Sequence, residues 1–356
     1  MRIICLDFET YFDREYSLKK MTTEAYVRDP RFMPHGAGVY ESGRAEWLSP
    51  DQLFERIYEW KHCEPVTLLC HHAHFDGLIL SHHFDYRPDF WLDTLSMGRV
   101  CFDATVSLFL DSLSRRFDLS PKNVPYELFG GLHWWELADS TRQQVADGCL
   151  HDCELTWQCA QYMLVGGHAA VPYPFPRSEL PVVDLTIRMF TEPCLIGDID
   201  LLAQAWTEEE NARQELFSQL GVTAADLRKD ATFAALLTEL GVEPELKTTA
   251  AGNEKYAFAK SDWFMQDLVV SEDPDVALLA EARLKAQSSI YQTRAERLGW
   301  KASRGPLPVY LAYAAAHTRR WGGGDKDNWQ NFPACRDRDD PVQYRKGALR
   351  RAIKAP

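Results

Sequence analysis

The sequence predicts an α/β domain followed by a mainly helical domain. In the first half, short apolar runs that suit buried strands alternate with a helical pattern. After a segment rich in glycine and proline, helical periodicity dominates. A length of 356 residues also suggests about two domains, at roughly 150 residues each. We therefore expect domains at 1–165 and 181–356, joined by a linker at 166–180.

Three apolar runs in the first domain are predicted to be strands. They cover residues 2–8, 35–40 and 66–70. Between the second and third runs, Pro50 and Asp51 open a periodic stretch that reaches Trp60. Its apolar positions lie on one helix face: Leu53, Phe54, Ile57 and Tyr58.

Three helices are predicted in the second domain. The first two cover Thr207 to Leu220 and Ala231 to Leu240, and each is followed by a glycine, which often caps helix ends. Asp273 and Pro274 then start a periodic run that predicts one helix to about Leu298. Such a helix is about 36 Å long.

The composition is that of an ordinary soluble globular protein, with 46% hydrophobic and 26% charged residues. No apolar run approaches the roughly 20 residues of a membrane helix. The nine cysteines are odd in number and irregularly spaced, which predicts reduced thiols, a cytoplasmic location and no disulfide framework.

The charge distribution is uneven along the chain. The net charge is −13, but residues 281–356 hold 16 Lys and Arg against 7 Asp and Glu, a balance of +9. The other 280 residues therefore carry −22. A basic C-terminal part can bind phosphates locally while the acidic remainder repels them. A solvated surface that is merely asymmetric is the alternative interpretation.

Two carboxylates stand at the end of the first predicted strand. Asp7 and Glu9 point to one face of that strand and Phe8 to the other, because strand side chains alternate. Two adjacent carboxylates repel each other unless a cation lies between them, so the pair suits half of a divalent-metal site. A solvated strand end is the alternative.

Two further acidic residues follow in an order that resembles a known superfamily. Phe75 and Asp76 come directly after the third predicted strand, and Asp152 lies on a predicted helix about 75 residues later. The series Asp7, Glu9, Asp76 and Asp152 resembles the four-carboxylate (DEDD) 3′–5′ exonucleases. The resemblance implies a ribonuclease H-like fold and two Mg²⁺ or Mn²⁺ ions. It also implies that Asp7 bridges both ions.

The resemblance leaves the water-orienting residue open. The superfamily places Tyr four residues before the last aspartate or His five before it, where this sequence has Gly148 and Asp147. We expect slow turnover that a Tyr at position 148 would raise, because position 148 lies one helical turn before Asp152. Alternatively, Asp147 or His151 orients the water.

From Glu179 onward the chain resembles the polymerase part of family A DNA polymerases, the bacterial DNA polymerase I type, and especially phage members. Segments around 179–202, 256–262 and 282–294 resemble the entry to that domain and its thumb. Segments 315–321 and 328–333 resemble its template–primer-binding motif, and 349–356 the start of the palm. The resemblance implies DNA contacts from Arg294, His317, Thr318, Arg319, Arg320, Gln330 and Asn331.

The sequence thus supports one leading hypothesis: a metal-dependent 3′–5′ proofreading exonuclease joined to the start of a family A polymerase. Its expected partners are single-stranded DNA 3′ ends, a primer–template duplex and the remaining palm and fingers. The palm aspartates would lie beyond Pro356, so no polymerisation is expected from these residues alone. One rival is an inactive exonuclease fold that only holds DNA, and another is a free-standing nuclease that acts on RNA.

Overall fold

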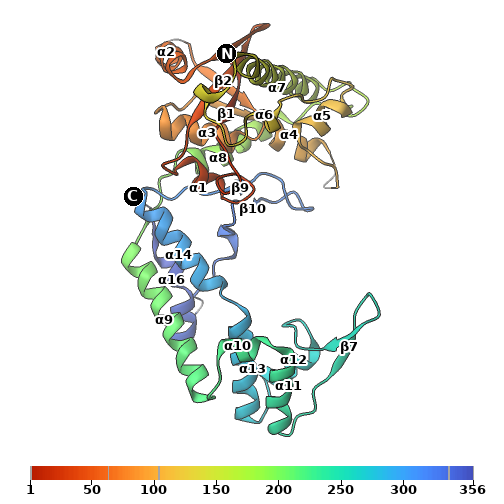
Figure 1. The fold of residues 1–356 in the computed structure, drawn as a ribbon, viewed down its shortest axis with the longest axis vertical. Coiled ribbons are helices and arrows are strands. Elements are labelled where there is room, and N and C mark those ends of the chain that lie inside the picture. Colours follow the sequence, from red (N-terminus) through yellow and green to blue (C-terminus); the bar gives the residue numbers. More distant parts are fainter. Residues whose placement is uncertain (1, 63, 103–104, 336, 356) are drawn as a thin grey trace. The chain divides into compact units, whose positions relative to one another are not determined.

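The computed structural model describes residues 2–62, 64–102, 105–335 and 337–355. The chain forms two compact units (Figure 1). The first unit comprises residues 1–194 and 308–331, and the second comprises 195–307 and 332–356. The chain therefore leaves the first unit and later returns to it. In the described part of the chain, every helix is too short or too polar to cross a membrane.

A five-stranded mixed sheet forms the centre of the first unit, in the order β3-β2-β1-β4-β5. β1 pairs in parallel with β4, and β4 with β5, whereas β2 is antiparallel to both β1 and β3. The central strand is apolar and almost wholly buried, as its Ile-Ile-Cys-Leu run requires. The strands are β1 (Arg2–Thr10), β2 (Pro34–Glu41), β3 (Arg44–Leu48), β4 (Val66–Cys70) and β5 (Phe90–Asp93).

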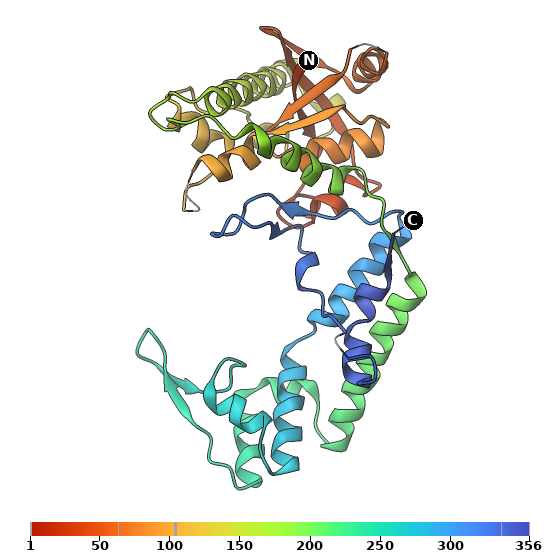
Figure 2. The same cartoon turned by 180° about the vertical axis from the view of Figure 1, so that it is seen from behind.

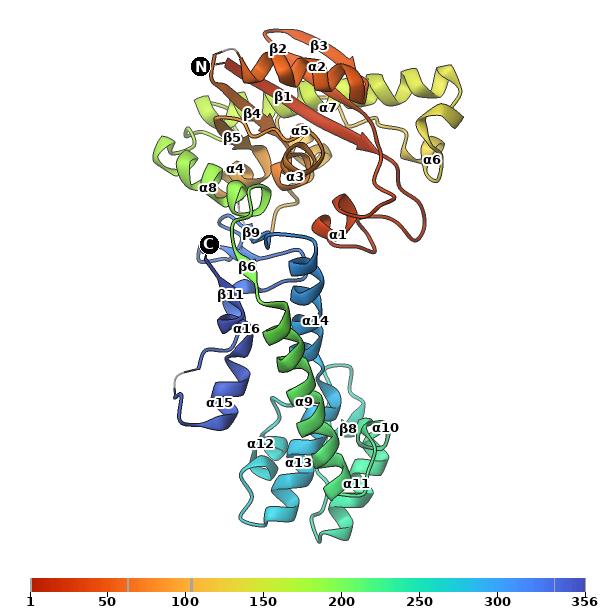
Figure 3. The ribbon, with the colours of Figure 1, turned by 90° about the vertical axis from the view of Figure 1, so that its left-hand side faces the viewer.

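Helices cover both faces of this sheet. Figure 3 shows α7 (Asp139–Val165) behind the sheet, with α2 (Pro50–Lys61) and α3 (Ala73–His83) in front. The side chains of β1 alternate between the two faces. Cys149 Sγ of α7 lies 3.5 Å from Asp7 Oδ2, whereas the ring of Phe8 packs 5.8 Å from that of Phe84 at the end of α3. Asp7 therefore faces α7.

The remaining elements of the first unit surround this core. Ser49 and Gln52 form a capping box at the start of α2. The short helices are α1 (Thr23–Val27), α4 (Thr94–Cys101), α5 (Leu110–Arg116), α6 (Tyr126–Phe129), η1 (Trp134–Glu136), η2 (Arg177–Glu179) and α8 (Leu180–Thr191). The returning segment adds β9 (Leu311–Ala312), β10 (Gly322–Gly323) and η3 (Trp329–Asn331).

The second unit is mainly helical. α9 (Ile199–Gln219) and α14 (Ile290–Ser303) lie side by side, and a bundle of shorter helices follows α9 (Figures 1 and 3). A hairpin of β7 (Leu246–Thr248) and β8 (Glu254–Tyr256) projects from that bundle (Figure 2). The other elements are β6 (Ile196–Gly197), α10 (Ala224–Arg228), α11 (Asp230–Glu239), α12 (Trp263–Val269), α13 (Pro274–Gln287), α15 (Pro341–Lys346), α16 (Ala348–Arg351) and β11 (Ile353–Lys354).

The predicted α/β pattern and the helical second half are confirmed, with two differences. The single helix expected from Asp273 to Leu298 is wrong, because Ser288 is extended (φ −125°, ψ 120°) between α13 and α14. Serine side chains compete with helical backbone hydrogen bonds, so two in a row favour an interruption. The helix expected from Thr207 starts earlier, at Ile199, because the Asp198 carboxylate caps it.

The compact units do not divide where the sequence places its linker. Segment 166–180 lies inside the first unit, and there Phe175 is buried and its N–H donates to the Met163 carbonyl, 2.7 Å away. Glycine and proline in this segment shape a packed connection to α8. The ribonuclease H-like identity of the first domain remains a prediction.

Candidate active site

Four carboxylates meet near the end of β1. Asp7 and Glu9 lie on β1 itself, Asp76 in the first turn of α3 and Asp152 on α7. The Phe8 N–H donates to Asp76 Oδ1 over 3.2 Å, which fixes Asp76 at the strand end. Glu9, Asp76 and Asp152 are all buried, at 4%, 1% and 1% exposure. The structure thus brings together the four residues that the sequence singles out.

Burial and mutual repulsion both disfavour ionisation of this cluster. Burial raises the pKa of Glu9 well above its usual range, and the charges of Asp7, Asp152 and Asp76 add to that rise. The pKa of Asp76 rises for the same two reasons, with Asp7 as the repelling neighbour. Burial likewise raises the pKa of Asp152 to about 7. Without added positive charge, the ionised form of this cluster is costly.

One ammonium group, from Lys122, offsets part of this negative charge. Lys122 Nζ donates to Asp152 Oδ2 and lies 5.2 Å from the centre of the Tyr126 ring. Burial alone would lower the pKa of Lys122, but the carboxylates of Asp7 and Asp152 raise it above its usual value. Lys122 is therefore a fixed cation among four carboxylates, and its one charge cannot balance all four in their ionised form.

The remaining charge and donors suit divalent cations. Asp152 Oδ1 is buried without a hydrogen-bond partner. In the described part of the chain, ligand atoms of Asp7, Glu9 and Cys149 lie within 4.8 Å of one another. Mg²⁺ and Mn²⁺ prefer oxygen ligands and retain several waters, so clustered carboxylates suffice to hold them. The four carboxylates fit the predicted ions.

A pocket of about 650 Å³ opens beside Glu9. Aromatic rings supply much of its wall, and three basic side chains lie around them. The aromatic residues are Phe8, Phe12, Tyr26, Phe75 and Tyr126, and the basic ones are Arg14, Lys19 and Lys20. Aromatic rings stack on bases and basic groups attract phosphates, so this lining suits a single nucleic-acid strand.

The structure leaves little space for a Tyr at position 148, which we expected to raise turnover. A Cβ on Gly148 would lie 2.9 Å from the Cα of Val124, so backbone fills the space that a larger side chain needs. Asp147 is exposed and accepts a hydrogen bond from Gln143. His151 Nε2 lies 3.2 Å from Ser120 Oγ and 3.1 Å from the Pro121 carbonyl. His151 thus contacts the segment that leads to Lys122.

The predicted DNA contacts divide between the two units. Arg294 lies on α14 of the second unit, with its guanidinium 5.8 Å from the centre of the Phe332 ring. The other six belong to the segment that returns to the first unit, and all six are exposed: His317, Thr318, Arg319, Arg320, Gln330 and Asn331.

Three of these residues line one cavity of about 640 Å³: Arg319, Arg320 and Gln330. Arg319 has a φ of 60°, the left-handed region that favours glycine. Its guanidinium donates to the carbonyls of Arg99 and Phe102. Arg320 Nε donates to Thr318 Oγ1 over 3.0 Å.

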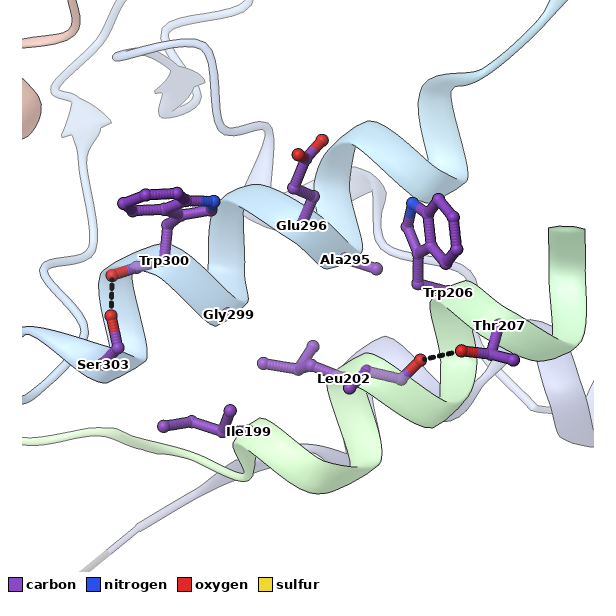
Figure 4. A pocket seen from close by; sticks show the side chains of 10 residues that line it. Ile199, Leu202, Trp206, Thr207, Ala295, Glu296, Gly299, Trp300 and Ser303 are labelled. Carbon is purple, nitrogen blue, oxygen red and sulfur yellow. Dashed lines mark hydrogen bonds between the residues drawn. The ribbon is translucent and has the colours of Figure 1, made fainter.

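A further cavity, of about 480 Å³, lies between α9 and α14 of the second unit. Figure 4 shows Trp206 and Trp300 on these two helices, with Glu296 nearby. Among the described residues that line it, Glu296 supplies the single carboxylate. This cavity lacks the grouped donors that the first unit has, so the candidate active site is the carboxylate cluster.

No sequence pattern marked Lys122, Tyr126 or Cys149 as site residues. Lys122 and Tyr126 lie between predicted elements, about 30 residues before Asp152, in a segment with no periodic signal. Cys149 precedes Asp152 by three residues, a spacing that places two helical side chains on one face. That spacing could have shown that Cys149 lies near Asp152, but it does not indicate what Cys149 does.

Comparison with known proteins finds similarity among solved structures. No protein-family model matches the chain, and no curated protein matches it. A solved structure that does match is the polymerase domain of Pol1 from M. smegmatis, in complex with a DNA primer–template and a dNTP. The TM-score is 0.58 at 18% identity. The match establishes the fold. It covers 98% of this chain and 54% of that one, so this chain spans about half the length of its structural neighbour.

Proposed function

We propose that this chain is a metal-dependent 3′–5′ exonuclease acting on single-stranded DNA ends and releasing nucleoside monophosphates. We further propose that it forms the N-terminal portion of a family A DNA polymerase. The observation that carries the proposal is the buried four-carboxylate cluster beside an aromatic and basic pocket. The fold similarity to a polymerase domain solved with primer–template DNA supports DNA as the partner.

Asp7, Glu9, Asp76 and Asp152 would hold the metal ions. Two divalent ions bound there would supply an activated water and stabilise the leaving 3′ oxygen. The Phe8 backbone N–H holds Asp76, and the Lys122 ammonium holds Asp152. Lys122 also brings a permanent positive charge to the place where a scissile phosphate would enter.

The pocket would position the strand. Phe12, Phe75 and Tyr126 offer aromatic faces to the terminal bases, and Lys19 and Lys20 offer charge to the phosphates. The exposed residues 317–320, together with Gln330, Asn331 and Arg294, would contact the primer–template duplex. These contacts would make binding sensitive to salt.

Two observations favour a second candidate, a catalytically weak fold that only holds DNA. The Lys122 ammonium already binds Asp152, and position 148 has neither a water-orienting side chain nor space for one. In that case DNA binding would persist while hydrolysis would be absent.

The experiment compares two variants on the same helix. Asp152→Asn should lower the release of nucleotides from a labelled single-stranded 3′ end by more than about 100-fold with Mg²⁺ or Mn²⁺, because it removes a buried metal ligand. Asp147→Asn is the matched control, since Asp147 is exposed and bonded to Gln143. It should retain the wild-type rate.

Three outcomes distinguish the candidates. A brisk metal-dependent wild-type rate that Asp152→Asn abolishes supports the exonuclease. DNA binding without hydrolysis at any metal concentration supports the DNA-holding module. A rate that persists in Asp152→Asn or in chelator contradicts a metal site at Asp152, whereas a loss in Asp147→Asn supports the alternative that Asp147 orients the water.

A further inference from the structure

A thiol stands directly against the carboxylate pair of β1. Cys149 is fully buried on α7, and its Sγ lies 3.5 Å from Asp7 Oδ2 and 3.3 Å from the Asp7 carbonyl oxygen. Ligand atoms of Asp7, Glu9 and Cys149 all lie within 4.8 Å of one another. One cation at the centre of this triangle can contact all three groups.

The sheet is shaped to admit this thiol. Gly38 on β2 pairs with Asp7 in the sheet register. A Cβ on Gly38 would lie 3.0 Å from Cys149 Sγ and 3.1 Å from Cys153 Sγ. Because position 38 has no side chain, α7 approaches the sheet closely enough for the Cys149 thiol to reach the Asp7 carboxylate. The backbone thus fixes the sulfur at the metal-binding end of β1.

A second, independent feature near this triangle also indicates a ligand. Asp152 Oδ1 is without a hydrogen-bond partner although Asp152 is only 1% exposed. The Asp152 carboxylate lies close enough to Glu9 to raise the pKa of that residue. A buried carboxylate oxygen with no partner costs free energy unless a cation or water satisfies it.

We propose that Asp7, Glu9 and Cys149 form a site for a thiophilic divalent cation of the Zn²⁺ or Cd²⁺ class. Thiolate sulfur is a soft ligand that selects such ions, whereas Mg²⁺ and Mn²⁺ bind oxygen ligands. As the metal–sulfur bond forms, the S–H bond of Cys149 breaks and its proton passes to solvent, with no change of oxidation state. Water completes the coordination.

The consequence, which rests on the proposed exonuclease function, is metal-dependent inhibition. Asp7 and Glu9 would serve both the oxygen-ligated ions and the thiophilic ion, so the two kinds of ion compete. A thiophilic ion held by Cys149 would block hydrolysis at low concentration and would be displaced only by a large excess of Mg²⁺. Cys149 would thereby make the nuclease sensitive to zinc-class ions.

The test uses Cd²⁺ alone, without DNA, and reads the ultraviolet charge-transfer absorption of cadmium–thiolate bonds. Cys194 and Cys335, which are exposed and partly exposed, are first replaced by Ser to lower the background. In this background we expect one tight Cd²⁺ per chain with a thiolate band. Cys149→Ser should abolish that band and weaken Cd²⁺ binding by at least about 10–100-fold.

Cys153→Ser is the matched control. Cys153 is equally buried one turn further along α7, but its thiol donates to the Gly38 carbonyl and not to a carboxylate. It should keep the band. Circular dichroism checks that each variant is folded, and Cys149→Ala replaces a misfolded Cys149→Ser.

The results separate this inference from the proposed function. A band that survives in Cys149→Ser, or that Cys153→Ser removes equally, overturns the inference. Absence of the band in a chain that hydrolyses DNA with Mg²⁺ also overturns it and leaves the exonuclease intact. The band without any nuclease activity supports the metal site while the exonuclease fails.

Discussion

Each unit of the chain buries charge, but in opposite ways. In the second unit, Arg283 is 1% exposed, and its guanidinium donates to the Leu227 carbonyl and to Asp230. The rings of Phe233 and Phe258 lie 5.2 and 5.8 Å from it. In the first unit, four carboxylates share one ammonium, and Asp152 Oδ1 has no partner. A satisfied buried charge indicates a structural role, whereas an uncompensated cluster indicates a site kept for a ligand.

The largest effect is expected at Arg283, the buried charge whose hydrogen bonds are satisfied. Arg283→Met should lower the local free energy of unfolding of the second unit by about 3–4 kcal/mol, because it strands the Leu227 carbonyl and removes a packed cation. Hydrogen exchange of the amides of α10, α11 and α13 measures this. The control is Lys285→Met on the same helix, whose partner Glu281 is 55% exposed. It should change the free energy by less than about 0.5 kcal/mol.

The next largest effect is expected at His35, a buried side chain that is neutral in the folded protein. His35 is 1% exposed, and neither of its ring nitrogens has a partner. Burial lowers its pKa to about 4. Between pH 4 and 6.5 the unfolded chain therefore binds the proton that the folded chain refuses, so stability falls as the pH falls.

Because the unfolded chain binds a proton at His35, the free energy of unfolding should fall by about 2 kcal/mol from pH 7 to pH 5. The measurement is the pH dependence of denaturant unfolding in wild type and in His35→Leu. The variant should lose that part of the slope. An identical slope in both proteins would show that His35 is hydrated or paired in solution.

The smallest effect is expected at Asp7, in the carboxylate cluster of the first unit. In chelator, Asp7→Asn should raise the free energy of unfolding by about 1 kcal/mol, because it removes one charge from a cluster with too many. Asp13→Asn is the control: its carboxylate accepts hydrogen bonds from the Glu15 and Tyr16 amides, so that variant should gain nothing. Thermal unfolding compares them. Destabilisation by Asp7→Asn without metal would contradict the view that this cluster awaits a cation.

Local patterns in the sequence predicted much of this fold. The buried runs at 2–8 and 66–70 are mostly apolar, so strands followed from these continuous apolar runs. The strands β3 and β5 were not predicted, because Arg44–Leu48 is short and largely exposed while Phe90–Asp93 is only four residues long. Neither carries enough alternation to stand out.

The candidate site was predictable in its carboxylates and not in its other groups. Asp7 and Glu9 are two residues apart on one strand, so their shared face follows from strand geometry. Lys122 reaches Asp152 only because the segment before α6 packs across α7, where Gly148 admits Val124. Such a contact depends on tertiary packing, which no local spacing records.

The return of the chain to the first unit also bears on its biosynthesis. His74 stacks on Tyr310 with 4.4 Å between ring centres, and His72 Nε2 lies 2.8 Å from the Tyr310 hydroxyl. Residues 195–307 must be synthesised between these partners, and at roughly 5–20 residues per second they take about 6–23 s. During that interval the nascent first unit lacks the segment that covers His74. Its completion on the ribosome therefore waits for the helices of the second unit to emerge.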